Sequence, residues 1–186
     1  HQLWSMDLST ETVCPYAGNG RESLDDGPLA SATLAQPSGI TSDSNRLYFA
    51  DSETSAVRSA DLNPHGRVRT IIGLGLFEFG DVDGSDHNIR LHRPIGLASH
   101  DGTIYLADTY NHKIREVLPV MRSSFTMLGN GQAGDRDGAG NQAQFSEPSG
   151  LSIAGGKIYI ADTNNHVIRV AGIESGEVST LEISGI

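Results

Sequence analysis

Three aspartates of the sequence are each followed, seven residues later, by an arginine. The pairs are Asp51 with Arg58, Asp108 with Arg115, and Asp162 with Arg169. A carboxylate beside a guanidinium could take part in acid–base catalysis, but recurrence in the same setting favours a structural role. We expect each arginine to lie diagonally across a β-hairpin from its aspartate and to form an ion pair with it. The same carboxylate can also accept backbone N–H groups of the turn that follows.

An Asp-Gly pair precedes each of these units, at Asp26-Gly27, Asp83-Gly84 and Asp137-Gly138. Two of these pairs follow a further aspartate, Asp81 or Asp135, in an arrangement similar to a calcium-binding loop. An EF-hand loop needs glycine at its sixth position and a bidentate glutamate at its twelfth. Here glycine stands fourth, and His92 or Ser146 stands twelfth. We therefore expect turns in which aspartate binds backbone N–H groups, without a metal ion.

Histidines occupy one equivalent position in three units, namely His1, His112 and His166. Histidines that converge on a central channel could bind a catalytic metal ion. Each of these, however, is expected to begin a third strand, in the outer half of its unit. We assign them a hydrogen-bonded structural role, together with the preceding Asn111 and Asn165. The other four histidines are expected in loops with solvated side chains: His65, His87, His92 and His100.

The sequence contains no recognisable arrangement for nucleophilic catalysis. Its one cysteine, Cys14, excludes an internal disulfide and a Cys-x-x-Cys motif, and is expected to pack on a strand or lie at its edge. The Gly-x-Ser-x-Gly motif is absent. The glycine-rich strings are not followed by the helix that a dinucleotide site requires. We therefore expect no catalytic residue, cofactor or metal ion in this chain.

The longest insertion between units carries two aromatic residues beside acidic ones. These are Phe77 and Phe79, followed by Asp81. Aromatic side chains in loops are typical of partner contacts, and we predict that these three residues contact a partner. In the alternative, the rings cover an adjacent unit or an N-terminal domain.

The elements that must hold these residues repeat along the chain. Pro37, Pro94 and Pro148 each precede the aspartate of their unit by fourteen residues and follow an Asp-Gly pair by eleven. Short apolar runs of strand length alternate with turn residues, and no stretch shows a sustained helical period. Four antiparallel strands in about 50 residues, repeated, are typical of a propeller blade. The sequence predicts an all-β propeller with essentially no helix.

We assign residues 1–18 to the last two strands of one blade and residues 37–73, 94–129 and 148–183 to three full blades. A closed propeller needs at least four blades. Because about 3.5 blades would leave apolar faces and strand edges exposed, we expect residues 1–186 to be a fragment of a larger propeller. The alternative is closure by a second copy.

Composition sets limits on the partners. The 186 residues carry a formal net charge of −10, which argues against a broad surface for nucleic acid or for an anionic membrane. The chain lacks the apolar run of about 20 residues that a membrane span requires. It shows no targeting signal, so a cytoplasmic location is favoured without being assigned.

The strings Asn111-His112-Lys113-Ile114 and Asn165-His166-Val167-Ile168 follow Ala-Asp-Thr and resemble the NHL repeat. The resemblance covers nearly the whole chain. The insertion at 76–84 and the opening His1-Gln2-Leu3-Trp4 further resemble proteins that join a thioredoxin-like domain to an NHL propeller. That resemblance implies a six-bladed propeller and a thioredoxin-like domain N-terminal to it, whose cysteine pair would lie upstream of His1.

We therefore predict a non-catalytic binding or scaffold module of a redox-linked protein. Its expected partner is a protein or the adjacent thioredoxin-like domain, with no nucleic acid and no membrane. Three alternatives remain open. A propeller hydrolase or lyase would hold a metal ion in the central channel, an RNA-binding NHL domain would carry a basic face, and a sensor ectodomain would follow a membrane span.

Overall fold

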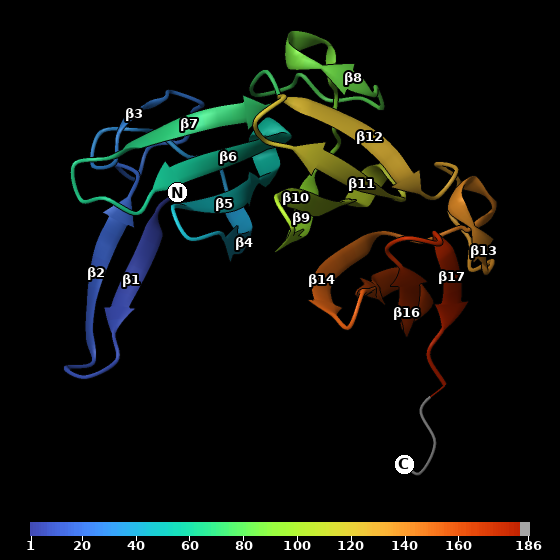
Figure 1. Ribbon diagram of the computed structural model, residues 1–186. Helices are drawn as coiled ribbons and strands as arrows, with labels where there is room; N and C mark the ends of the chain where they lie inside the picture. Colours follow the sequence, from blue (N-terminus) through green and yellow to red (C-terminus); the bar gives the residue numbers. More distant parts are fainter. Residues whose placement is uncertain (183–186) are drawn as a thin grey trace.

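The computed structural model describes residues 1–182 of the chain. These residues form four antiparallel sheets, of which one is a two-stranded hairpin and three have five strands each. The three larger sheets fan out around a common centre, with β4, β9 and β14 on the concave side and β7, β12 and β17 on the outer side (Figure 1). This arrangement confirms the all-β, partial-propeller fold expected from the repeats. Residue 183, the expected end of the last blade, lies outside the described residues.

The three full blades share one order of strands, and the hairpin precedes them. The hairpin consists of β1 (Leu3–Asp7) and β2 (Thr12–Ala17). The first blade consists of β3 (Gly27–Pro28), β4 (Pro37–Ser42), β5 (Arg46–Asp51), β6 (Ala56–Asp61) and β7 (Arg67–Ile72). The second consists of β8 (Gly84–Ser85), β9 (Pro94–His100), β10 (Thr103–Asp108), β11 (Lys113–Leu118) and β12 (Ser123–Leu128). The third consists of β13 (Gly138–Ala139), β14 (Pro148–Ala154), β15 (Lys157–Asp162), β16 (Val167–Gly172) and β17 (Glu177–Thr180).

The apolar core lies between neighbouring sheets rather than within one. Successive side chains of a strand point to opposite faces, so one strand serves two cores. In β10, Ile104 and Leu106 pack with the first blade, whereas Tyr105 and Ala107 pack with the third. A smaller cluster joins the hairpin to the first blade and includes Leu3. Each blade is therefore stabilised chiefly by its neighbours.

The inner strands of neighbouring blades approach each other closely, and glycine permits this. A Cβ atom on Gly39 would collide with the carbonyl oxygen of Ile95, and one on Gly96 with that of Ser149. The corresponding Gly150 of the third blade meets nothing closer than 3.6 Å. Gly39 and Gly96 thus permit the close approach of the next blade, whereas Gly150 has no such role among the described residues.

Two details differ from the expectations. Each full blade has a fifth, two-residue strand at its outer edge, because the Asp-Gly segment continues into a short pairing with the outermost long strand, for example Gly84 with Ser124. Five short 3₁₀ helices also occur in residues 1–182, although essentially no helix was expected. They are η1 (Ser52–Thr54), η2 (Asp86–Asn88), η3 (Thr109–Asn111), η4 (Gly140–Gln142) and η5 (Thr163–Asn165). A single 3₁₀ turn is too short to produce a periodic pattern.

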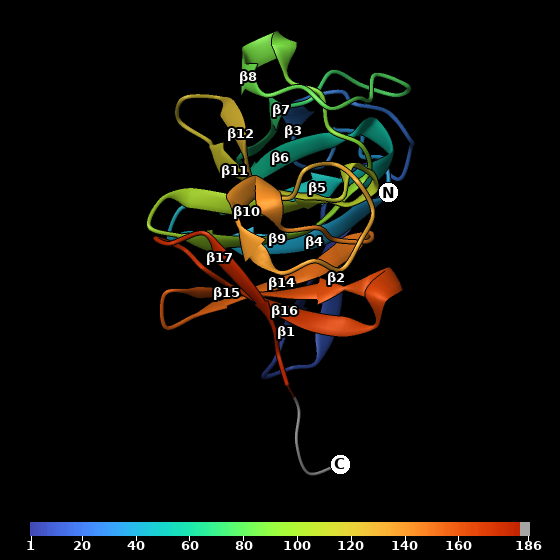
Figure 2. The same cartoon turned by 90° about the vertical axis from the view of Figure 1, so that its right-hand side faces the viewer.

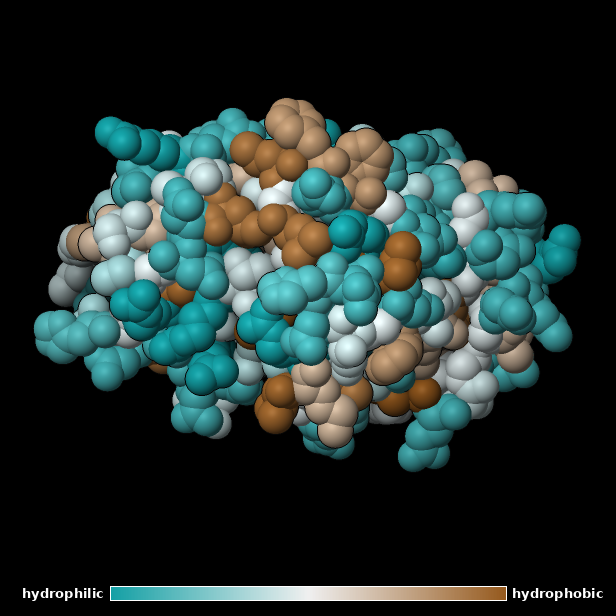
Figure 3. Space-filling view, turned by 90° about the horizontal axis from the view of Figure 1, so that it is seen from above, coloured by the Kyte–Doolittle hydropathy of each residue, from teal (hydrophilic) through white to brown (hydrophobic). Residues whose placement is uncertain are grey.

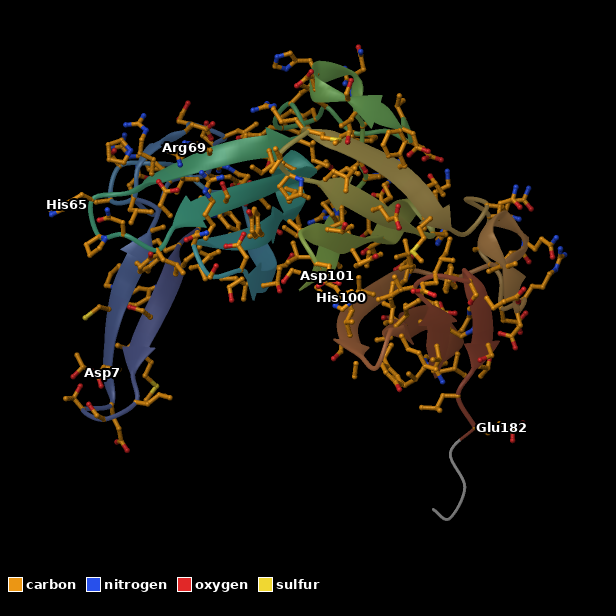
Figure 4. All side chains as sticks on the ribbon, in the orientation of Figure 1. Asp7, His65, Arg69, His100, Asp101 and Glu182 are labelled. Atoms are coloured by element: carbon orange, nitrogen blue, oxygen red, sulfur yellow. The ribbon has the colours of Figure 1, made fainter. Side chains whose placement is uncertain are left out.

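The loops of the second blade and the hairpin extend beyond the fan of sheets. The β8 region projects above the outer strands in two perpendicular views (Figures 1 and 2). Asp7 marks the far end of the hairpin, and His100 and Asp101 lie on the concave side (Figure 4). No helix among the described residues has the length and apolar character needed to cross a membrane.

Candidate functional site

Each full blade buries an arginine against the aspartate that ends its second long strand. The arginines are Arg58, Arg115 and Arg169, and all three side chains are fully buried. Their nitrogen-to-oxygen distances to Asp51, Asp108 and Asp162 are 2.9, 2.6 and 2.9 Å. The strand register explains the pairing, since Arg58 lies opposite Phe49 and Asp51 opposite Ala56. The ion pair is therefore diagonal across the hairpin, as the seven-residue spacing predicts.

The same arginine also contacts the aspartate of the Asp-Gly pair. Arg58 lies 3.0 Å from Asp26, and Arg169 lies 2.6 Å from Asp137. Arg115 bonds Asp83 in the same way. The interpretation of these aspartates as turn residues was incomplete. Each also forms an ion pair with the buried arginine of its own blade.

The aspartate that ends the second long strand of each full blade (Asp51, Asp108 or Asp162) does not cap the turn that follows it, so the expectation from the sequence is corrected. Its second carboxylate oxygen instead accepts the backbone N–H of a residue sixteen positions earlier. The donors are Ala35, His92 and Ser146, each at 2.7 Å. The carboxylate thereby ties the segment entering the blade to the hairpin, and this long-range contact leaves no mark in the local sequence.

Burial and ion pairing act in opposite directions on the pKa of three of these carboxylates, those of Asp51, Asp108 and Asp137. Burial raises the pKa of Asp51 and of Asp108, against the effect of the arginine in each blade. Burial also acts to raise the pKa of Asp137, but hydrogen bonds from Arg169 and Thr180 outweigh it and hold that pKa below its usual value. Removing one partner of such a pair would leave an uncompensated buried charge.

Two histidines of the repeat, His1 and His112, connect one blade to the next. His112 is the left-handed residue that ends η3, and its Nδ1 accepts the backbone N–H of Glu147 at 3.1 Å. His1 accepts the N–H of Gln36 in the same way, and Ser55 accepts that of Arg93. These three residues therefore have hydrogen-bonded structural roles. His112 and His166 lie just before β11 and β16 rather than on them.

The asparagines of the repeat connect the turn to the rest of the blade. Asn111 donates from Nδ2 to Asp108 and to the carbonyl oxygen of Gly80. Asn165 makes the matching bonds to Asp162 and Gly134. Within residues 1–182, no group of three or more histidine, cysteine, aspartate or glutamate side chains is placed to hold a metal ion.

The segment before β8 departs from the repeat. Eight residues (18–25 and 129–136) separate the last strand from the Asp-Gly pair after β2 and after β12, whereas ten (73–82) do so after β7. This longer segment carries Phe77 and Phe79, whose side chains are 85% and 55% exposed. Phe77 also has a φ of 67°, a left-handed conformation that is strained for a bulky residue.

The two phenylalanines line a hollow between the first and second blades, called here the aromatic groove. Its cavity is about 140 Å³ and is lined by Glu53, Ser55, Phe77, Phe79, His92, Arg93 and Tyr110. The rings of Phe79 and His92 stack with centroids 4.5 Å apart at 13°, and the ring of Tyr110 stands edge-on to His92 at 5.2 Å. Seen from above, the surface is mostly hydrophilic and apolar side chains gather in a few patches (Figure 3).

Polar contacts hold the wall of the aromatic groove in place. The Arg93 guanidinium lies 2.8 Å from Glu53, 3.2 Å from Gln36 Oε1 and 5.8 Å from the centre of the Tyr110 ring. His92 donates its backbone N–H to Asp108. The groove is therefore tied directly to the buried ion pair of the second blade.

The base of the loop is anchored just after Phe79. Gly80 donates to the carbonyl oxygen of Leu91 at 2.9 Å. Asp81 lies 2.6 Å from Lys113 and 2.5 Å from Arg115. The main chain of the loop is thus fixed at one end, so the exposed rings are presented from a held position.

The structure brings together only part of the predicted contact set. Phe77 and Phe79 line the groove, whereas Asp81 does not line it and is paired with Lys113 and Arg115. Three residues of the groove, Tyr110, Arg93 and His92, are absent from the predicted contact set, and the expectation of a solvated His92 side chain is wrong, because its ring stacks on Phe79. Tyr110 stands where the third unit has Asn164, and this single aromatic departure from the repeat is the signal that could have indicated it.

Comparison with known proteins relates the chain to a repeat family and to two groups of longer proteins. Residues 145–171 match the NHL repeat. The chain is 40% identical to Protein SUPPRESSOR OF QUENCHING 1, chloroplastic, of Arabidopsis thaliana, over all of its own length and 19% of that protein's. It is 38% identical to NHL repeat-containing protein 2 of Gallus gallus, over 98% of its own length and 29% of that protein's. The chain thus spans less than a third of these relatives.

Solved structures support the fold. An auxiliary nutrient binding protein of Bacteroides ovatus aligns with a TM-score of 0.71 at 19% identity, over 96% of this chain and 43% of the other. A chain of a nidogen/laminin complex aligns with a TM-score of 0.66 at 13% identity, over 98% of this chain and 56% of the other. At these identities the likeness concerns the fold alone.

Proposed function

The chain belongs to the NHL-repeat β-propellers, and from that premise we propose that it is a non-catalytic binding module whose contact surface is the aromatic groove. The supporting observation is the pair of exposed rings, Phe77 and Phe79, on a loop that is anchored by Asp81 and unlike its counterparts. Aromatic residues and arginine are enriched where protein interfaces gain most of their binding energy.

The residues that recur at constant spacing in the blades serve the framework rather than the contact surface. The recurrent aspartates, arginines and asparagines, and the histidines His1 and His112, bond one another or the backbone of the blades. A group already satisfied in this way contributes to the framework that positions a site. The groove, in contrast, combines residues of two blades and one inserted loop.

We further propose that the partner is a protein, and in the whole protein a thioredoxin-like domain of the same polypeptide. This rests on the resemblance to proteins that join such a domain to an NHL propeller, and on the coverage of less than a third of the relatives. The chain has one cysteine, Cys14, so a dithiol reaction would use cysteines of the partner.

The test places a photo-crosslinking phenylalanine analogue at position 77, in the protein expressed in its native host, and identifies crosslinked partners by mass spectrometry. The matched control places the same analogue at position 125, where Phe125 of β12 is 47% exposed outside the groove. We expect one defined protein or domain crosslinked from position 77 and absent from position 125. Identical products at both positions, or none at position 77, would overturn the proposal.

A further inference from the structure

We propose that the aromatic groove binds an extended, proline-containing peptide segment flanked by basic residues. This inference rests on the proposed function, because it names the class of partner for the same surface. It draws on the size of the groove, the chemistry of its walls and the charge of the chain.

The size of the groove favours an extended segment. Its cavity of about 140 Å³ is bounded by the loop at Phe77 and by η1 and η3 of two blades. An α-helix with its side chains is about 10–12 Å across and needs a long apolar trough. A hollow of this size receives one or two side chains of an extended chain.

The walls offer flat aromatic faces. Phe79 and Tyr110 expose ring surface, and both contact His92. The cationic group of the wall, the Arg93 guanidinium, is held by Glu53 and Gln36. A ligand that presents many N–H groups would lose hydrogen bonds to water on entering such a site.

Proline meets this condition. It has no backbone N–H, and its ring packs against aromatic faces. Proline-rich segments also populate the polyproline II conformation before binding, which lowers the entropy lost on association. The exposed face of Phe79 opposite His92 is where we place a proline ring, with Phe77 as the outer wall.

Charge indicates what should flank the prolines. The chain carries a formal net charge of −10. The charges at the groove are paired, since Arg93 lies 2.8 Å from Glu53, and Glu78 of the loop lies 3.9 Å from Arg90. The relevant charge is therefore that of the chain as a whole. A chain of net negative charge increases the rate of encounter with a basic segment and disfavours an acidic one. Lysine or arginine beside the prolines therefore complements the net charge of the chain.

The test titrates the 186-residue chain with a synthetic probe, a run of prolines with a lysine pair at each end, by calorimetry and by amide NMR. Two control peptides replace the prolines by alanines or the lysines by glutamates. We expect saturable binding of the probe with shifts centred on residues 76–80, 92–93 and 110. We expect no binding of the alanine peptide and weaker binding of the glutamate peptide.

Variants then locate the site. Phe79→Ala and Phe79→Leu should each weaken probe binding at least about tenfold, because leucine keeps apolar volume and removes the ring face. Phe125→Ala, an exposed phenylalanine outside the groove, should leave binding unchanged. Circular dichroism and unfolding of each variant check that the fold persists.

The outcomes separate this inference from the proposed function. Equal binding of the alanine peptide, or full binding by Phe79→Leu, would overturn the proline assignment. A partner crosslinked from position 77 together with no binding of the probe would overturn it while leaving the proposed function in place. Failure of both experiments would overturn both.

Discussion

The buried ion pairs and the aromatic groove are built in opposite ways. The ion pairs recur in three blades with the same residue types and spacing, and their side chains are inaccessible. The groove occurs once, combines residues of two blades and one loop, and leaves its rings exposed. In this chain, recurrence marks the framework and departure from the repeat marks the surface available to a partner. Substitutions in one region at a time, the ion pairs or the groove, test this difference.

The largest effect is expected from Arg115→Met. This change leaves Asp108 buried without its guanidinium, and breaking a buried pair costs about 3–5 kcal/mol of unfolding free energy. Chemical denaturation measures the loss. The control is Arg69→Met, because Arg69 is 44% exposed and pairs with Asp61 at the surface, where such pairs contribute about 0–1 kcal/mol.

Arg115→Met and Arg169→Met should differ in their effect on the aromatic groove. Arg169→Met should destabilise the chain about as much as Arg115→Met, yet only Arg115 bonds Asp81 at the base of the loop. Amide NMR should therefore show the groove disturbed by Arg115→Met and retained in Arg169→Met. Equal losses in Arg115→Met and Arg69→Met would show that the buried pairs are not the framework.

A smaller loss is expected from Gly96→Ala. The added methyl would collide with the carbonyl oxygen of Ser149 in the neighbouring blade, and overpacking of this kind costs about 1–3 kcal/mol. The matched control is Gly150→Ala, the same position of the third blade, where the nearest atom is 3.6 Å away. Denaturation of both variants should show a loss only for Gly96→Ala, and equal losses would contradict the role of close blade approach.

Phe77→Gly, on the loop, should leave the unfolding free energy almost unchanged. Phe77 has a φ of 67° and is 85% exposed, so its side chain contributes strain and little packing. Glycine removes a left-handed penalty of about 1–2 kcal/mol and adds chain entropy to the unfolded state, so stability should change by less than about 1 kcal/mol. Chemical denaturation checks this, and a large loss of stability would assign Phe77 to the framework.

The sequence predicts the framework better than the groove for a physical reason. Asp108 and Arg115 lie on adjacent strands of one hairpin, so their seven-residue spacing encodes their contact. Phe79, His92 and Tyr110 meet only after three separate turns are placed by the packing of the blades. Contacts of this kind depend on the folded arrangement and leave no periodic pattern. The bond of Asp108 to the His92 N–H was missed for another reason: it recurs in each full blade at a spacing of sixteen residues, but a backbone donor requires no particular residue type.

The smallest effect concerns pH and separates the two regions by electrostatics. The pKa of Asp137 lies below its usual value in the folded chain, because the bonds from Arg169 and Thr180 outweigh burial. Ionised Asp137 therefore stabilises the fold above its unfolded pKa of about 4, and this contribution disappears as the pH falls through the lowered folded value. Asp137→Asn should be less stable than the unchanged chain at neutral pH, and the difference should shrink in acid. Its half-exposed side chain limits the size of the effect.

Phe77→Gly changes no charge, so its unfolding free energy should run parallel to that of the unchanged chain across the same pH range. If the difference in unfolding free energy between Asp137→Asn and the unchanged chain stayed constant down to acid pH, Asp137 would act through hydrogen bonding alone. The recurrent carboxylates would then contribute geometry, and not charge, to the framework on which the groove is built.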